Sequence, residues 1–228
     1  MANAVKPSFD AVYAQLEALG SEKVRAIYAR QGAGENTFGV KRGDLRRLAK
    51  EIKRDHALAM RLWETGNTDC RMLATMIMDP AALSESELEA MLTPLTYYAL
   101  VDDLVDNVIA RSPHAEALRL RWMPSSEELV GRAGWALLIE RISEGRTEDL
   151  DIPALLAVIE AEVVSAPVRK HEKMTQAQVE IALRLPEYRE TCIALGERLG
   201  RFDQRPVSKG CTPFYAPDWI AAVLARKK

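Results

Sequence analysis

Apolar residues recur at helical spacing along almost all of this 228-residue chain, and the alternation typical of a β-strand is nearly absent. Side chains at i, i+3, i+4 and i+7 lie on one face of an α-helix, so each such stripe predicts a helix that buries that face. One stripe runs from Phe9 to Leu19, begins after Pro7-Ser8 and stops at Gly20. Proline before a helix and glycine after it are typical boundaries. The pattern predicts an all-α protein of about a dozen helices.

Gly or Pro separates most of the later stripes, and Asn67, Thr68 or Asp69 is suited to cap the helix that follows. Pairs of helices recur at roughly 35–45 residues, which favours a curved α-helical solenoid of HEAT-like repeats, an α–α superhelix. No segment is long or polar enough to be a linker, so we expect a single domain over residues 1–228. We expect Pro206–Pro213 to be non-helical. The later stripes lie in 96–110, 113–122, 126–143, 152–164, 168–184, 187–199 and 217–226.

The composition is that of a globular protein, with 48% hydrophobic and 28% charged residues, which excludes a disordered chain. The longest uncharged run, Ala90 to Val101, is too short to span a bilayer, and the N-terminus lacks the order of a signal peptide. Cys70, Cys192 and Cys211 are odd in number and far apart, as in a protein of a reducing compartment. We therefore expect a cytoplasmic protein without a membrane partner.

The formal net charge of −2 conceals a strong segregation of charge along the chain. Residues 21–54 hold ten Lys and Arg against four Asp and Glu, residues 81–162 hold six against sixteen, and residues 168–209 hold nine against six. Salt screens charges beyond about 8–10 Å, so the local balance rather than the total steers a polyanion. Two basic segments that flank an acidic middle favour a nucleic-acid groove with an acidic outer wall. Unevenly charged, solvated helix faces are the alternative.

The most basic helix is predicted within Phe38–Arg54, with Leu45, Leu48, Ala49 and Ile52 on its buried face. The segment Gln31–Thr37 precedes it and is expected to be a flexible approach that lets the helix start lie close to a ligand. A helix with one buried stripe and cations on its other faces favours a polyanion as partner. The cations of this segment are Arg46, Arg47, Lys50, Lys53 and Arg54.

Another predicted helix carries three carboxylates, those of Asp102, Asp103 and Asp106, within a span of five residues. Asp102 and Asp106 are at i and i+4, so they share one edge and repel by about 0.2–0.5 kcal/mol when exposed. A solvated face tolerates that cost, and this is one interpretation. The other is a carboxylate placed to stabilise a cation, whose pKa like charges would raise and a nearby Arg would lower.

Metal and nucleophile motifs are absent from the sequence. His56, His114 and His171 have no zinc-ligand spacing, and neither a GxSxG nor a Walker sequence is present. We expect no metal and no cofactor.

The segment Gly39-Val40…Leu45-Arg46…Leu48-Ala49-Lys50 resembles the N-terminal signature of the AlkD-like DNA alkylation repair family, the HEAT-like repeat DNA glycosylases. Leu62–Ala74 is similar to the structural Leu-Trp helix pair of that family, and the resemblance covers roughly residues 20–200. It implies a protein that binds duplex DNA through the phosphate backbone. It further implies excision of N3- or N7-alkylated purines by hydrolysis of the N-glycosidic bond.

Family proteins carry a Trp-Asp-x-Val-Asp segment whose last Asp faces the deoxyribose. Asp103-Leu104-Val105-Asp106 matches its second half, which implies a catalytic role for Asp106, with Asp102 at the position of the Trp. A register four residues earlier instead aligns Tyr98 with the Trp and Asp102 with the catalytic Asp. We prefer Asp106 and keep Asp102 as the alternative.

The segment around Arg132 resembles the Arg-Ala helix of the family, whose Arg contacts DNA near the lesion. A Trp and an Arg on a later family helix fall near Met174 and Ala177, so both are absent here. This loss keeps a second hypothesis open, a HEAT-like scaffold that binds DNA or a protein partner without catalysis. Trp63 and Trp135 are expected in the core. The expected DNA contacts are Arg46, Arg47, Lys50, Tyr98, Arg132, Arg169 and Lys170.

Overall fold

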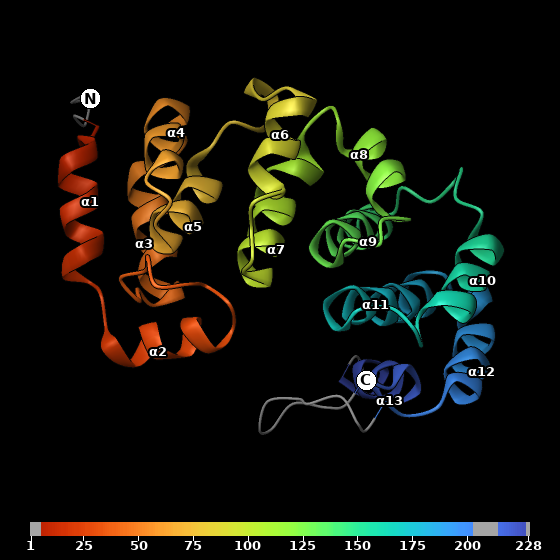
Figure 1. Ribbon diagram of the computed structural model, residues 1–228. Coiled ribbons are helices and arrows are strands. Elements are labelled where there is room, and N and C mark those ends of the chain that lie inside the picture. Colours follow the sequence, from red (N-terminus) through yellow and green to blue (C-terminus); the bar gives the residue numbers. More distant parts are fainter. Residues whose placement is uncertain (1–5, 203–213, 227–228) are drawn as a thin grey trace. The chain divides into compact units, whose positions relative to one another are not determined.

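All regular structure in the described part of the chain is helical (Figure 1). The computed structural model describes residues 6–202 and 214–226, so Cys211 and the segment Pro206–Pro213 lie outside the described residues. The all-α class predicted from the periodicity is confirmed. Within these residues the α-helices are α1 Phe9–Ala18, α2 Glu22–Arg30, α3 Arg42–Ile52, α4 His56–Glu64, α5 Thr68–Ile77, α6 Glu85–Leu92, α7 Tyr98–Asn107, α8 Ala115–Trp122, α9 Glu128–Ser143, α10 Ile152–Glu162, α11 Val168–Arg184, α12 Arg189–Leu199 and α13 Ala216–Arg226, with 3-10 helices η1 Pro80–Ala82, η2 Ile109–Arg111 and η3 Pro186–Tyr188.

The chain divides into two compact units, Met1–Ala115 (unit 1) and Glu116–Lys228 (unit 2), and α8 begins at the boundary. Compactness alone does not show whether the two units fold together, so the single domain expected from the sequence stays a prediction. None of the helices in the described residues is both long and apolar enough to cross a membrane.

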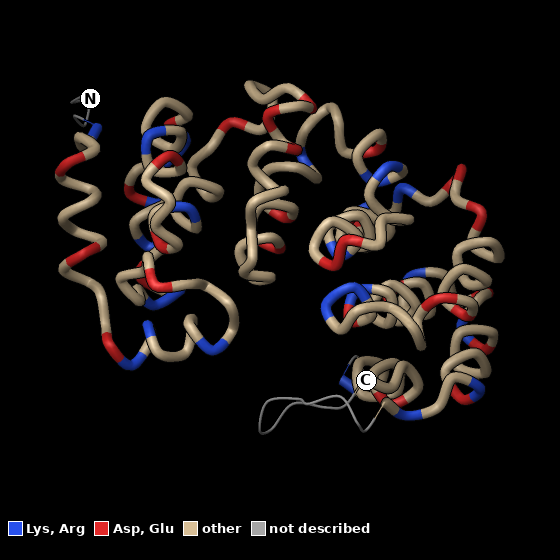
Figure 2. Tube along the Cα trace, in the orientation of Figure 1, with Lys and Arg blue, Asp and Glu red and all other residues tan. Residues whose placement is uncertain are grey.

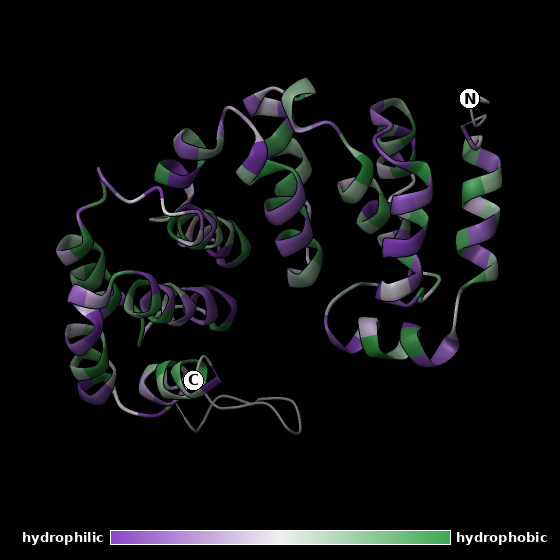
Figure 3. Cartoon of the chain, turned by 180° about the vertical axis from the view of Figure 1, so that it is seen from behind, coloured by the Kyte–Doolittle hydropathy of each residue, from purple (hydrophilic) through white to green (hydrophobic). Residues whose placement is uncertain are grey.

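Unit 1 is organised around α5, which packs against α3, α4 and α7. A helix with neighbours on several sides must be apolar on several faces, and α5 buries Cys70, Met72, Leu73 and Ile77. Its neighbour α3 buries only one stripe, which includes Leu45. Figure 3 shows hydrophobic and hydrophilic positions together on the same helices.

Unit 2 is built on the packing of α9 against α11. Trp135, Leu138 and Ile142 of α9 are fully buried, and Trp63 in unit 1 is 7% exposed, so the core positions expected for both tryptophans are confirmed. Gly134 lets α8 approach α9 closely. A Cβ atom there would lie 2.3 Å from the backbone nitrogen of Met123.

Three of the four members of the stripe predicted for the basic helix are confirmed, because Leu45, Leu48 and Ile52 are at most 5% exposed, whereas Ala49 is only half-buried. The helix ends at Ile52, earlier than its pattern of charges indicated. Lys53 has a positive φ of 65°, a conformation that terminates the helix, so Lys53 and Arg54 lie beyond it.

Candidate nucleic-acid interface

The outward side of α3 carries the cations that the sequence singled out. Arg46, Arg47 and Lys50 are all exposed. Arg47 is engaged on its own helix, at 3.1 Å from Glu51 Oε1 and 3.6 Å from Asp44 Oδ1. Neither Arg46 nor Lys50 forms an ion pair with any of the described residues. These two are spaced i and i+4, so they present adjacent charges on one helix edge.

The first residue of α3 ties this helix to α7. Arg42 makes a two-pronged ion pair with Asp103, in which Nη2 donates to Oδ1 at 2.7 Å and Nη1 donates to Oδ2. Burial raises the pKa of the Asp103 carboxyl above its ordinary value, and the Arg42 guanidinium works against that rise. Sequence reasoning missed this pair because its members are 61 residues apart and belong to no common motif.

Two of the predicted site residues flank this ion pair. The charge of Asp102 raises the pKa of Asp103 and the charge of Arg46 lowers it, after the larger effects of burial and Arg42. Asp102 and Asp106 are half-buried on α7, where Figure 2 shows the run of acidic positions. The structure therefore brings carboxylates of α7 and a cation of α3 to one region of unit 1.

Aromatic residues line the start of α7. Tyr98, the first residue of the helix, is half-buried and its ring centroid lies 5.7 Å from that of Tyr97. Tyr97 packs against Tyr28 at 5.8 Å and its hydroxyl donates to Gln31 Oε1 at 3.0 Å. Burial raises the pKa of Tyr97 above its ordinary value, so its phenol stays protonated. Tyr98 precedes Asp102 by one helical turn, on the same edge of α7.

The approach to α3 is held by hydrogen bonds, which corrects the flexibility expected for Gln31–Thr37: the carbonyl oxygens of Gly32 and Ala33 accept from the hydroxyls of Thr96 at 3.1 Å and Thr68 at 3.0 Å. Asp69 of α5 is fully buried, and Oδ2 accepts from the hydroxyl of Thr37 at 2.7 Å and from the backbone N–H groups of Phe38 at 2.6 Å and Gly39 at 3.0 Å. Oδ1 accepts from the N–H of Val40 at 2.8 Å. We call the hydrogen bonds that this carboxylate accepts the Asp69 clasp.

The capping residue and the geometry of the loop explain why the clasp forms. Of the three candidates, Asn67 is the cap of α5, since its side chain accepts from the N–H groups of Asp69 and Cys70. Asp69 is therefore available to the loop. Gly39 has a φ of 79°, and its backbone packs so close to α2 that a Cβ atom would lie 2.5 Å from Arg25 N. Only glycine fits that position without strain.

The side chains predicted to contact DNA in unit 2 are bonded to other residues of the protein. Arg132 of α9 is 4% exposed, and its Nη1 donates to the carbonyl oxygen of Arg169 at 2.8 Å and to Glu172 Oε2 at 2.6 Å. Lys170 is also 4% exposed, and its Nζ donates to the Ser125 carbonyl at 3.0 Å. Arg169 is the outermost of the three, with a side chain 35% exposed and paired to Glu172.

The positions matched to the lost family Trp and Arg are interior. Met174 and Ala177 of α11 are fully buried in the core of unit 2, so neither side chain offers a surface to a ligand. The nine predicted site residues thus divide between the units: Arg46, Arg47, Lys50, Tyr98, Asp102 and Asp106 belong to unit 1, whereas Arg132, Arg169 and Lys170 belong to unit 2.

A family model described as DNA alkylation repair enzyme matches residues 12–184. The chain belongs to this family. Membership confirms the resemblance drawn from the segment around α3, and the match includes every residue proposed for the site.

The solved structures give the same assignment. One, from a family of proteins related to the HEAT-like repeat DNA glycosylases with affinity for branched DNA structures, superimposes with a TM-score of 0.86. Its sequence is 27% identical, and the alignment covers 97% of this chain and 95% of that chain. This similarity confirms the HEAT-like repeat fold predicted from the helix pattern.

Two curated relatives are uncharacterized proteins of Listeria innocua and Listeria monocytogenes. Each is 24% identical over 142 residues, which is 60% of this chain. The matched part spans 63% of the length of each relative.

Proposed function

We propose that this chain acts in DNA alkylation repair and binds duplex DNA along the exposed edge of α3. The observation that carries the proposal is the pair Arg46 and Lys50, two exposed cations on one helix edge that form no ion pair with the described residues. Such a pair can bind two phosphates without first breaking an ion pair with a carboxylate. Phosphate contacts position DNA without reading its sequence.

The other predicted contacts support this edge in different ways. Arg47 is in exposed ion pairs, which are weak enough, at about 0–1 kcal/mol, to exchange a carboxylate for a phosphate. Arg169 is held more firmly, because the side chain of its partner Glu172 is only 14% exposed. Arg132 holds the Arg169 carbonyl, so we propose that it positions Arg169 rather than touching DNA. Lys170 has the same kind of internal role through the Ser125 carbonyl.

We propose Asp106, with Asp102 as the alternative, as the carboxylate that acts on the deoxyribose. An N3- or N7-alkylated purine already carries a positive charge and leaves readily, so no general acid is required. The remaining task is to stabilise an oxocarbenium-like sugar, which a fixed, ionised carboxylate performs by preorganised electrostatics. Both residues are half-buried on a helix that the Arg42–Asp103 pair fixes to α3, and Tyr98 supplies an aromatic face nearby.

A second candidate function is DNA binding without cleavage. It is favoured by the burial of Met174 and Ala177, which leaves no Trp or Arg surface at the positions where the family places them. The family of the solved relative has affinity for branched DNA structures. On this alternative, the cations of α3 would grip the arms of a junction and the α7 carboxylates would have no chemical role.

Binding is tested with labelled duplex and four-way-junction DNA by fluorescence anisotropy over a range of salt concentrations. Arg46→Glu/Lys50→Glu should weaken binding to any sequence, and loss of two phosphate contacts should reduce the slope of log K against log salt by about 2. The matched control, Arg184→Glu/Arg198→Glu, makes the same change of charge at exposed cations of α11 and α12. Equal loss in both variants would contradict a role for α3.

Catalysis is tested by release of 7-methylguanine and 3-methyladenine from alkylated duplex. If Asp106 stabilises the sugar cation, Asp106→Asn should lower the release rate by at least about 100-fold with little change in DNA affinity. Asp10→Asn, at an exposed carboxylate of α1, is the control. Loss of release in Asp102→Asn alone would move the role to Asp102. Binding by a wild-type protein that releases neither base would establish the second candidate.

A further inference from the structure

Helix α10 is apolar on more faces than unit 2 covers. Its core face, Ile152, Leu156 and Ile159, is at most 5% exposed. Leu155 is only half-buried and Val158 is 38% exposed. A helix that is apolar nearly all round is normally enclosed on all sides. Within the described residues, α10 therefore keeps apolar surface, at Val158 and on part of Leu155, that no other helix covers.

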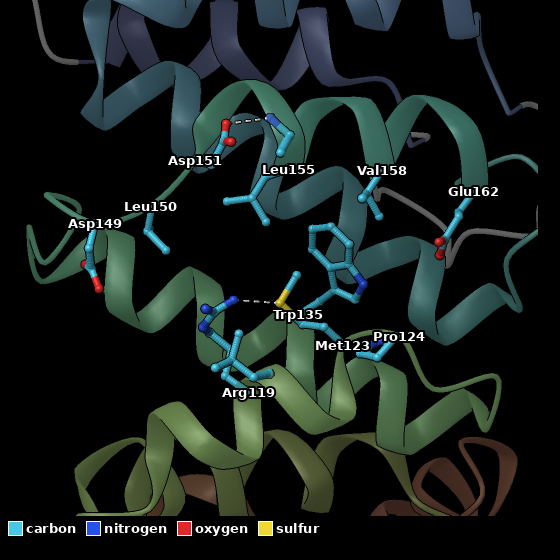
Figure 4. A pocket seen from close by; sticks show the side chains of 12 residues that line it. Arg119, Met123, Pro124, Trp135, Asp149, Leu150, Asp151, Leu155, Val158 and Glu162 are labelled. Atoms are coloured by element: carbon cyan, nitrogen blue, oxygen red, sulfur yellow. Dashed lines mark hydrogen bonds between the residues drawn. The ribbon is translucent and has the colours of Figure 1, made fainter.

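That face borders a cavity of about 370 Å³ that lies entirely in unit 2. Leu155 and Val158 of α10 and the indole of Trp135 on α9 line this cavity (Figure 4). Leu120 of α8 is a further lining residue. Leu120 is 60% exposed, so apolar surface continues from the cavity outward onto its rim. We call this cavity and its rim the α8–α10 groove.

The groove also contains a polar group without a partner. Trp135 is fully buried, and its Nε1–H makes no hydrogen bond with any described residue. Buried N–H donors in native proteins are nearly always satisfied, so an orphaned one requires an explanation. The indole is enclosed, so an occupant of the groove packs over it and does not reach this N–H.

The charges around the groove are sorted by depth. The carboxylates reach the surface: the side chain of Asp149 is 76% exposed, that of Glu162 is 47% exposed, and Asp151 is exposed. The cations beside them, Arg119, Arg141 and Lys170, are at most 9% exposed. An approaching molecule meets negative charge first, which repels nucleic acid and attracts a cationic partner.

We propose that the α8–α10 groove docks a segment of a second protein, in which apolar side chains are flanked by Lys or Arg. The apolar side chains enter the cavity that Leu120 and Val158 line, and the flanking cations meet Asp149 and Glu162. This site belongs to unit 2, is distinct from the α3 edge, and does not depend on DNA binding.

The probe is a fluorescein-labelled helical peptide of about 18 residues, with Leu at i, i+3, i+4 and i+7 and Lys elsewhere. Its counterpart carries Glu in place of Lys. The full chain should bind the Lys peptide and not the Glu peptide in anisotropy titrations. Leu120→Glu/Val158→Glu adds two negative charges to the protein, which would strengthen any unspecific attraction for the cationic Lys peptide. Docking in the groove predicts the opposite, a loss of at least about ten-fold in affinity.

A further variant separates docking from other causes. Val164→Glu/Val168→Glu makes the same substitution at exposed valines outside the groove and should keep the affinity or raise it. No binding of the Lys peptide, or equal binding by the Leu120→Glu/Val158→Glu variant, overturns the proposal. Saturable binding of benzylamine without peptide binding overturns it in favour of a small organic cation.

Discussion

A buried carboxylate contributes to a fold in proportion to the donors it satisfies, and Asp69 satisfies four. Removing it would leave several backbone N–H groups buried without an acceptor, at about 1–3 kcal/mol for each. We expect Asp69→Ala to lower the free energy of unfolding by at least about 3 kcal/mol in urea titrations. Asp10→Ala, at an exposed acidic residue of α1, should change it by less than about 0.5 kcal/mol. Comparable losses in both variants would show that the Asp69 clasp contributes no more to the free energy of unfolding than an exposed carboxylate does.

The surroundings of Asp55 predict that the stability of the fold depends on pH in the acidic range. It caps α4 by accepting from the N–H of Leu58 at 3.1 Å, and the hydrogen bond from Lys6 is the main cause that lowers the pKa of its carboxyl. A carboxyl with a lowered folded-state pKa stabilises the protein above its unfolded pKa of about 3.9, and that contribution is lost as the pH falls through the folded value.

Asp55→Asn should therefore be less stable than the wild type at neutral pH, by at most about 1 kcal/mol, because asparagine keeps the cap but loses the charge. The difference should shrink as the pH falls below about 3.9 and vanish below the folded-state pKa. Unfolding titrations across this range measure it. A difference that stays constant with pH would rule out the ion pair as its source.

At the scale of elements, Gly134 sets the distance between α8 and α9. A Cβ atom at this position would lie 2.6 Å from the Trp122 carbonyl carbon as well as 2.3 Å from Met123 N, and both are backbone atoms that cannot rotate away. Gly134→Ala should cost about 1–3 kcal/mol or more. The control is Gly43→Ala in α3, where a Cβ atom meets nothing within 4 Å. That helical position should be unchanged or gain up to about 1 kcal/mol.

The elements were predictable from the sequence, whereas the contacts between them were not. Helical periodicity identified the stripe of α3, because the burial of Leu45, Leu48 and Ile52 depends only on local spacing. The Asp69 clasp left no signal, since most of its donors are backbone N–H groups that any sequence possesses. The Arg42–Asp103 pair was equally invisible, because only the packing of α3 and α7 on α5 brings the two residues together.

For the molecule as a whole, the prediction of a single domain can be tested with the variants above. Asp69→Ala lies in unit 1 and Gly134→Ala in unit 2. If the chain unfolds as one cooperative domain, each variant should shift the same single transition, and circular dichroism and tryptophan fluorescence should report the same midpoint. Two separable transitions, each sensitive to only one variant, would show that the units are independent domains.

The sites argued for the two units differ in the sign of the charge that they present. Along α3 the exposed groups include Arg46 and Lys50, whereas around the α8–α10 groove they include Asp149 and Glu162. Each site repels the partner that the other attracts. This arrangement would let one chain hold nucleic acid and a basic protein segment at the same time, without competition for the same surface.

The burial of Asp69 and Asp103 alters the electrostatic potential that develops outside the protein. Both are counted among the 33 acidic residues that outnumber 31 basic ones. Asp103 and the Arg42 guanidinium cancel as a pair, which leaves the net charge of −2 unchanged, and Asp69 keeps its charge behind the N–H dipoles that stabilise it. Because salt screens distant charges, a DNA strand at α3 would respond to the exposed cations Arg46 and Lys50 of that edge more than to the charge of the whole chain.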